Sequence, residues 1–168
     1  MNQNTDTFGI ALEFVLDHEG GYVNDSDDPG GETRFGISKR AHPDVDIVNL
    51  TREGAALIYW EAYWQKARCE DFPAALAIAL FDGAVNHGPG SAVLMLQQAL
   101  GVAADGIVGP VTLAAAQQAN GRRVINDLLT RRVLLYNDIT KANSRQARFL
   151  RGWIRRVLDL HQLVATHV

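Results

Sequence analysis

Cysteine is nearly absent from this chain: Cys69 is the only one in 168 residues. No internal disulfide can form, so the fold does not need an oxidising compartment for its stability. A lone thiol can serve as a catalytic nucleophile, but here no histidine stands in an obvious partner motif. We therefore expect Cys69 to be a small buried apolar residue.

Long apolar runs are also missing. The stretch Phe8–Leu16 is broken by Glu13, and the N-terminal residues carry no basic leader. These features argue against a membrane span and against a signal peptide. We expect the protein to be synthesised and folded in the cytoplasm without a signal peptide. A substrate outside the membrane would then be reached only after release by another factor.

Motifs for metals and phosphates are lacking as well. The five histidines show neither the His-Glu-x-x-His motif nor other spacings usual for zinc, and no glycine-rich phosphate loop is present. We expect no metal and no cofactor.

The composition is that of an ordinary globular protein, with 47% hydrophobic and 21% charged residues. A chain of this length can bury one real core, so we expect a single compact body and a monomer.

Charge is distributed unevenly along the chain. Residues 122–156 hold ten Lys/Arg and two Asp, a net charge of +8, whereas the rest holds six basic and seventeen acidic groups, a net charge of −11. The basic groups are either solvated helix faces that partly pair with the acidic half, or a surface that draws the protein to an anionic wall or membrane. No nucleic-acid motif accompanies them, so nucleic acid is not an expected partner.

Apolar spacing of three and four residues predicts a mainly helical, all-α chain. Thr51 is suited to cap one helix, Ser91 to cap another, and the segment from Ala74 to Val85 is apolar on nearly every face, as in a central buried helix. Strand alternation is not clear anywhere, and Gly, Pro, Asn and Asp indicate a loop or small hairpin near residues 22–37. The expected helices cover residues 7–18, 51–64, 74–85, 91–100, a short segment through Ala116, 123–142 and 144–164.

Glu19 closes the first expected helix, just before Gly20-Gly21. The negative end of the helix dipole disfavours the ionised carboxylate there, and glycoside hydrolysis needs an acid that keeps its proton near neutral pH. Glu19 is therefore either a general acid or a surface glutamate at a helix end.

A second acidic group follows on the glycine-rich loop. Asp25, Asp27 and Asp28 lie within nine positions of Glu19, and Thr33 comes five residues after Asp28. A carboxylate across a cleft could activate water while the Thr33 hydroxyl helps to hold that water. Some of these aspartates are also suited to turns, where they bond their own backbone.

The stretch Glu19–Ser38 resembles the signature of glycoside hydrolase family 108, the N-acetylmuramidases found in phages and prophages. The resemblance implies that Glu19 is catalytic and that Tyr22 contacts substrate. The spacing of Glu19, Asp28 and Thr33 also resembles the Glu, Asp, Thr triad of classical phage lysozymes, with one residue fewer before the threonine. Together these resemblances imply a lysozyme-like fold in which the segment near residues 22–37 forms one side of a cleft.

Two further pieces resemble the same family: Tyr59–Trp64 and Phe81–Gly88. Asp82 and Asn86 share a helical face and could line the cleft, or they could be a buried structural acid and a helix cap. Trp60, Tyr63 and Trp64 could stack on sugar rings, or they could belong to the core. Of these five residues we expect Asp82, Asn86, Tyr63 and Trp64 to contact substrate.

The segment Leu96–Thr112 resembles a helical peptidoglycan-binding repeat, in which an Asp-Gly turn caps the next helix. This turn has a structural role whether or not it binds a ligand. We expect a muramidase catalytic region over residues 1–90 and a peptidoglycan-binding-like region over 91–168, packed into one body.

The resemblance implies an endolysin that hydrolyses the β-1,4 bond between N-acetylmuramic acid and N-acetylglucosamine in peptidoglycan. Carboxyl groups of Glu19 and Asp28 separated by roughly 6.5–9.5 Å would favour an inverting mechanism, whereas about 5 Å would favour a covalent intermediate. The alternatives are a non-catalytic peptidoglycan-binding or virion-associated wall protein, a lytic transglycosylase, or a chitinase-like hydrolase. The basic C-terminal helices could add a membrane-disrupting role.

Overall fold

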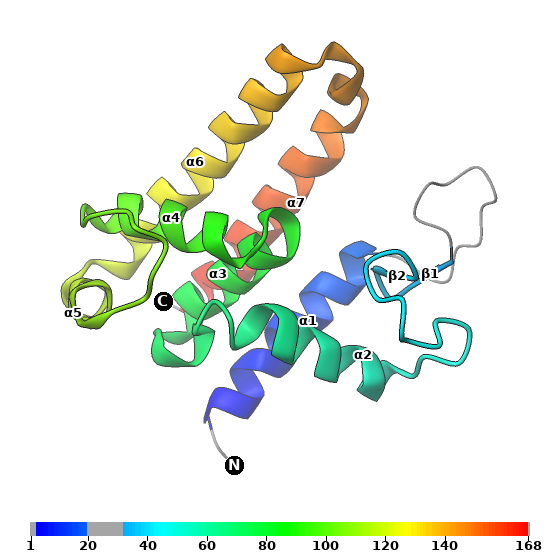
Figure 1. Cartoon of the computed structure of the whole chain (residues 1–168). Helices are drawn as coiled ribbons and strands as arrows, with labels where there is room; N and C mark the ends of the chain where they lie inside the picture. The colour runs from blue at the N-terminus through cyan, green and yellow to red at the C-terminus, as the bar shows by residue number, and fades with distance from the viewer. Residues whose placement is uncertain (1–2, 20–31, 168) are drawn as a thin grey trace.

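The structure is a computed structural model that describes residues 3–19 and 32–167 (Figure 1). It confirms the expected mainly helical fold with a small hairpin. The α-helices are α1 (Gln3–Glu19), α2 (Arg52–Tyr59), α3 (Ala74–His87), α4 (Pro89–Leu100), α5 (Pro110–Gln118), α6 (Gly121–Ala142) and α7 (Ala147–Ala165). The hairpin strands are β1 (Thr33–Arg34) and β2 (Ile37–Ser38), and short turns are η1 (Trp60–Trp64), η2 (Cys69–Asp71) and η3 (Ser144–Gln146).

Helix α1 begins before the expected start and ends at Glu19, as the glycine pair after it predicts. One face is buried, through Ala11, Leu12, Val15 and Leu16. Burial of this stripe fixes how α1 is rotated about its axis, because apolar side chains three and four residues apart must all face the core. The rotation therefore determines the direction in which Glu19 points.

The β1–β2 hairpin is held against the end of α1. Its two-residue turn has φ 54° at Phe35 and φ 74° at Gly36, the positive values that a tight hairpin turn requires. A Cβ atom on Gly36 would lie 2.9 Å from the Glu19 Cβ and Cγ atoms and 2.7 Å from the Tyr59 hydroxyl. The Tyr59 hydroxyl donates to the Phe35 carbonyl at 2.9 Å. Glycine is thus needed at position 36 for the hairpin to lie directly on Glu19.

Helix α2 starts where the sequence predicts. The Thr51 hydroxyl accepts from the Gly54 amide at 3.1 Å, which caps the first turn. At its C-terminal end α2 passes into the π-helical turn η1, which ends at Trp64. The Trp64 ring is fully buried and meets Phe8 and Phe81 edge-on, at 5.2 and 5.5 Å between ring centroids.

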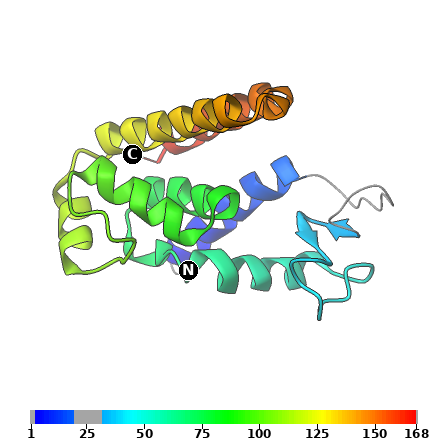
Figure 2. The ribbon, with the colours of Figure 1, turned by 45° about the horizontal axis from the view of Figure 1, so that its top comes forward.

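Helix α3 is the central helix, and its burial on nearly every face confirms the sequence expectation. It contacts α1, α4, α6 and α7. Figure 2 shows α6 and α7 as a layer on one side of α3 and α4, with α2 and the hairpin on the opposite side. Side chains at the C-terminal end of α3 can therefore meet residues from both halves of the chain.

Helix α4 begins at Pro89, so the expected cap at Ser91 is wrong. Proline fits the first turn of a helix because its missing N–H would have no partner there and its φ is already close to helical. Gly88 has φ 81° and separates α3 from α4. The two helices therefore follow one another with a single residue between them.

The Asp105-Gly106 turn has the structural role that the sequence predicts. The buried Gln97 amide donates to Asp105 Oδ1 at 2.7 Å and to the Ile107 carbonyl at 3.0 Å. In return, Gln97 Oε1 accepts from the Gly106 amide at 2.8 Å. A glutamine of α4 therefore holds the turn that leads into α5.

Helices α6 and α7 run antiparallel and are joined through η3 (Figure 1). The Asn120 side chain caps α6 by accepting from the Arg123 amide at 3.1 Å. Among the described residues, no helix is long and apolar enough to cross a membrane.

Candidate active site

Glu19 lines a polar groove of about 490 Å³ between the end of α1, the end of α3 and one face of α7. Its side chain is 26% exposed, so the carboxyl group reaches solvent without lying on an open surface. The other lining residues are His18, Asn86, Gly152, Trp153, Arg155, Arg156 and Asp159. This position is what a proton donor to a bound ligand requires.

Arg156 holds the Glu19 side chain from across the chain. Its Nη1 donates to Glu19 Oε1 at 2.7 Å, although the two residues are 137 positions apart. Its Nε donates to Asp82 Oδ1 at 2.8 Å. One guanidinium therefore joins α1, α3 and α7 at the groove, and charge-assisted bonds of this length are the stronger class of hydrogen bond.

Asp82 is the buried anchor of this arrangement, with 1% of its surface exposed. Arg132 Nη1 lies 2.7 Å from Asp82 Oδ2, so the carboxylate lies between two guanidiniums. Burial alone would raise the pKa of Asp82, but the charges of Arg132 and Arg156 outweigh it and hold the pKa below its ordinary value. Asp82 is thus the buried structural acid, and it cannot touch substrate in this structure.

The network continues from Arg132 away from the groove. Arg132 Nη2 donates to the Tyr136 hydroxyl at 3.3 Å, and that oxygen lies 3.3 Å from His87 Nε2. Arg132 has no exposed surface, so its charge depends on Asp82 for compensation. These contacts link the C-terminal end of α3 to the middle of α6.

His87 gives the network a pH dependence. Burial, together with the Arg132 guanidinium, lowers the pKa of His87 from 6.5 to about 4. Between these two values the unfolded chain binds a proton that the folded chain does not, so stability falls as pH falls through this window and is level above it. Allowing for the partial exposure of the ring, we expect a loss of about 1–2 kcal/mol.

Urea unfolding of the wild type and of His87→Asn, measured from about pH 7 to about pH 4, tests this expectation. The substitution should flatten the slope in the window between these two pKa values. Equal slopes for the wild type and His87→Asn would show that His87 is protonated equally in both states.

The other predicted site residues lie in different places. Asn86 lines the groove, and its Nδ2 donates to the Asp82 carbonyl at 2.7 Å. Tyr63 is half-buried, and burial followed by the charge of Glu19 raises its pKa, so it lies near the carboxyl group without lining the groove. Trp64 is in the core and cannot stack on a sugar in this structure. Thr33 is half-buried in β1, on the hairpin that packs on Glu19.

Two predicted residues, Tyr22 and Asp28, lie outside the described residues, so their roles remain predictions. The distance between the Glu19 and Asp28 carboxyl groups, which bears on inversion or retention, is likewise untested. Cys69 is fully buried, and burial raises the pKa of its thiol well above the ordinary value, as expected for a core residue rather than a nucleophile.

Sequence reasoning missed Arg132, Arg156 and Trp153. The sequence pattern could have indicated Arg132 and Arg156, because each arginine falls on the buried stripe of its helix. A basic residue on an apolar stripe needs a buried acidic partner. Trp153 lines the groove and stacks on Tyr136 at 5.0 Å between ring centroids.

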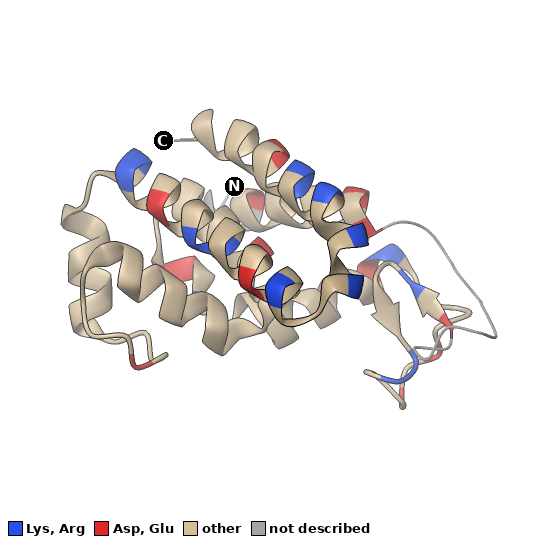
Figure 3. Cartoon of the chain, turned by 90° about the horizontal axis from the view of Figure 1, so that it is seen from above, with Lys and Arg blue, Asp and Glu red and all other residues tan. Residues whose placement is uncertain are grey.

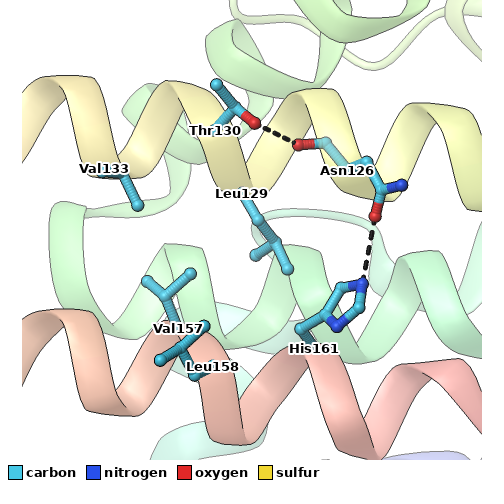
Figure 4. A pocket seen from close by; sticks show the side chains of 7 residues that line it. All are labelled: Asn126, Leu129, Thr130, Val133, Val157, Leu158 and His161. Carbon is cyan, nitrogen blue, oxygen red and sulfur yellow. Dashed lines mark hydrogen bonds between the residues drawn. The ribbon is translucent and has the colours of Figure 1, made fainter.

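A second hollow, of about 350 Å³, lies between α6 and α7 (Figure 4). Its lining is mostly apolar, through residues such as Leu129, Val133 and Val157. The polar contact drawn across the two helices joins His161 Nε2 and Asn126 Oδ1 at 3.1 Å. None of the residues that line this hollow in the described part of the chain carries a carboxyl group, so they offer no acid to a glycosidic bond.

The mainly helical body with its small hairpin is a lysozyme-like fold, and Glu19 lines a polar groove in it. Residues 12–88 match the family model Glycosyl hydrolase 108, and residues 91–158 match the model described as a predicted peptidoglycan domain. The solved structure of SagA from Brucella abortus is 34% identical, with a TM-score of 0.82, and the match covers 97% of this chain and 96% of SagA. None of the curated proteins matches. The chain belongs to glycosyl hydrolase family 108, and the second match supports peptidoglycan as its partner.

Arg156 lies within the segment that matches the peptidoglycan domain, whereas Glu19 and Asp82 lie within the hydrolase segment. The hydrogen bonds from Arg156 to Glu19 and Asp82 therefore join the two matched segments. Removing the second segment would remove the guanidinium that positions Glu19.

Proposed function

We propose that the protein is an endolysin-type N-acetylmuramidase that hydrolyses the β-1,4 bond between N-acetylmuramic acid and N-acetylglucosamine. The observation that carries this proposal is the Glu19 carboxyl group, which lines a polar groove and is held there by Arg156 at 2.7 Å. An acid in a fixed position beside a bound glycan can protonate the departing sugar oxygen.

The roles of the residues follow from this arrangement. Arg156 bonds Oε1 of Glu19, and we assign the transferable proton to Oε2. Asn86 and Trp153 line the same groove and supply an amide and an aromatic edge for the sugars. Asp28 with Thr33 would position the water or stabilise the oxocarbenium-like transition state, as the family resemblance implies.

The site of action is a further part of the proposal. We propose that the protein acts on the cell wall after release from the cytoplasm in which it is made. We propose further that it acts as a monomer.

Digestion of purified sacculi by the full chain tests the proposal, with the products identified by mass spectrometry. We expect new reducing ends that carry N-acetylmuramic acid. Anhydro ends would indicate a lytic transglycosylase, and N-acetylglucosamine at the reducing ends would indicate a different bond. Binding to sacculi without release of any fragment would indicate a non-catalytic wall-binding protein.

A further inference from the structure

The charged groups around the groove are not all compensated. Arg156 is paired with Asp82 and Glu19, and His18 Nε2 lies 3.4 Å from Asp159 Oδ2. Arg155 also lines the groove, but it forms no ion pair with any acidic residue in the described part of the chain. Within that part, Arg155 is the groove cation whose charge is left for a ligand.

Arg155 lies close to Glu19 because the next residue, Arg156, donates a hydrogen bond to the Glu19 carboxyl group. Arg156 points inward to the Glu19 carboxyl group and to Asp82, whereas Arg155 is exposed. An anion bound by Arg155 would therefore lie beside the sugar whose bond Glu19 protonates, because both side chains line one groove.

Basic residues continue from Arg155 along α7. Arg151 and Arg148 precede it by four and seven positions, which places all three on one face of the helix. All three are exposed, and Figure 3 shows Lys and Arg gathered along α7 toward the tip that it forms with α6. The groove cation is thus the first of a row that leads away from Glu19.

We propose that Arg155 binds a carboxylate of the substrate and that Arg151 and Arg148 extend this anion site along α7. The inference rests on the proposed function, because N-acetylmuramic acid is the sugar that carries an acidic substituent. Its lactyl group ends in a free carboxylate or, through an amide bond, in a stem peptide that carries carboxylates of its own. A guanidinium matches a carboxylate in a two-pronged geometry, which neutral sugars do not offer.

The test measures binding, so that it does not depend on cleavage. Three soluble glycan oligomers serve as probes: one with stem peptides, one stripped of peptides so that the lactyl carboxylates are free, and one whose carboxylates have been amidated. Calorimetry gives the dissociation constants for four proteins that all carry Glu19→Gln to prevent cleavage: the parent with no further change, and the parent with Arg155→Gln, Arg155→Lys or Arg122→Gln. Arg122 is a matched control, because it is exposed at the start of α6, away from the groove residues.

We expect Arg155→Gln to weaken binding of the carboxylate-bearing oligomers about tenfold, the effect of losing one charge-assisted hydrogen bond. Binding of the amidated oligomer should not change. Arg155→Lys should recover part of the loss, and Arg122→Gln should behave as the parent. A loss confined to the peptide-bearing oligomer would identify the stem peptide as the source of the carboxylate, and a loss on the stripped oligomer would identify the lactyl group.

Three results would overturn the anion site: no loss in Arg155→Gln, an equal loss on charged and amidated oligomers, or a loss of binding to phosphatidylglycerol vesicles with glycan binding intact. The last would assign the basic row to a membrane surface. Failure of the proposed function is distinct, because it would appear as intact sacculi in the digestion experiment whatever the behaviour of Arg155.

Discussion

Glu19→Gln is expected to lower the rate of sacculus cleavage by about a hundredfold to ten-thousandfold, the contribution of general acid catalysis. The substitution removes the transferable proton and changes the shape of the side chain very little. The amide oxygen can still accept from Arg156 Nη1, so the groove should keep its form. Release of reducing ends from sacculi, measured beside a thermal melt, gives the result.

Glu13→Gln is the matched control for this substitution. Glu13 lies on the exposed face of α1 and pairs with Arg52, so the same chemical change is made on the same helix next to another arginine. It should cleave sacculi as the wild type does. Full activity in Glu19→Gln, or an equal loss in both variants, would remove Glu19 from the reaction.

Asp82→Ala is expected to lower the free energy of unfolding by about 3–5 kcal/mol, because it leaves the buried charge of Arg132 without its partner. Arg156 would lose its anchor in the same step, so activity should fall together with stability. Asp82→Asn, which keeps oxygen and shape but not charge, should lie between wild type and the alanine variant. Urea unfolding at neutral pH measures all three.

Asp127→Ala is the control for Asp82→Ala, because Asp127 pairs with Arg131 on the surface of the protein. The nearest atoms of these two side chains are 3.1 Å apart. Both side chains are about a third or more exposed, and pairs of this kind contribute about 0.5 kcal/mol or less. Asp127→Ala should therefore have almost no effect. If Asp82→Ala were as mild as Asp127→Ala, the buried ion pairs of Asp82 would not be what joins α3 to α6 and α7.

Local sequence signals predicted the parts of the fold that local chemistry determines. The cap at Thr51, the buried α3 and the end of α1 before two glycines each depend on a few neighbouring residues. The start of α4 was missed because both Pro89 and Ser91 suit a first turn; in the structure Gly88, with φ 81°, directly precedes Pro89, the first residue of the helix.

Only some residues of the candidate site could be predicted from the sequence. Glu19 and Asn86 could be found because motif and helix position both point to them. The bond from Arg156 to Glu19 spans 137 positions, and no local pattern states which acid a distant arginine will meet. Trp64 was assigned to substrate because aromatic spacing cannot tell a sugar platform from a core residue, and the structure places it in the core.

The direct test of Glu19 as the acid is a crystal structure of the Glu19→Gln variant with a glycan oligomer of alternating N-acetylmuramic acid and N-acetylglucosamine. We expect a glycosidic oxygen within about 2.6–3.2 Å of the side chain at position 19, the reach of a proton donor. A saccharide seated elsewhere, for example between α6 and α7, with the groove at position 19 empty, would contradict it.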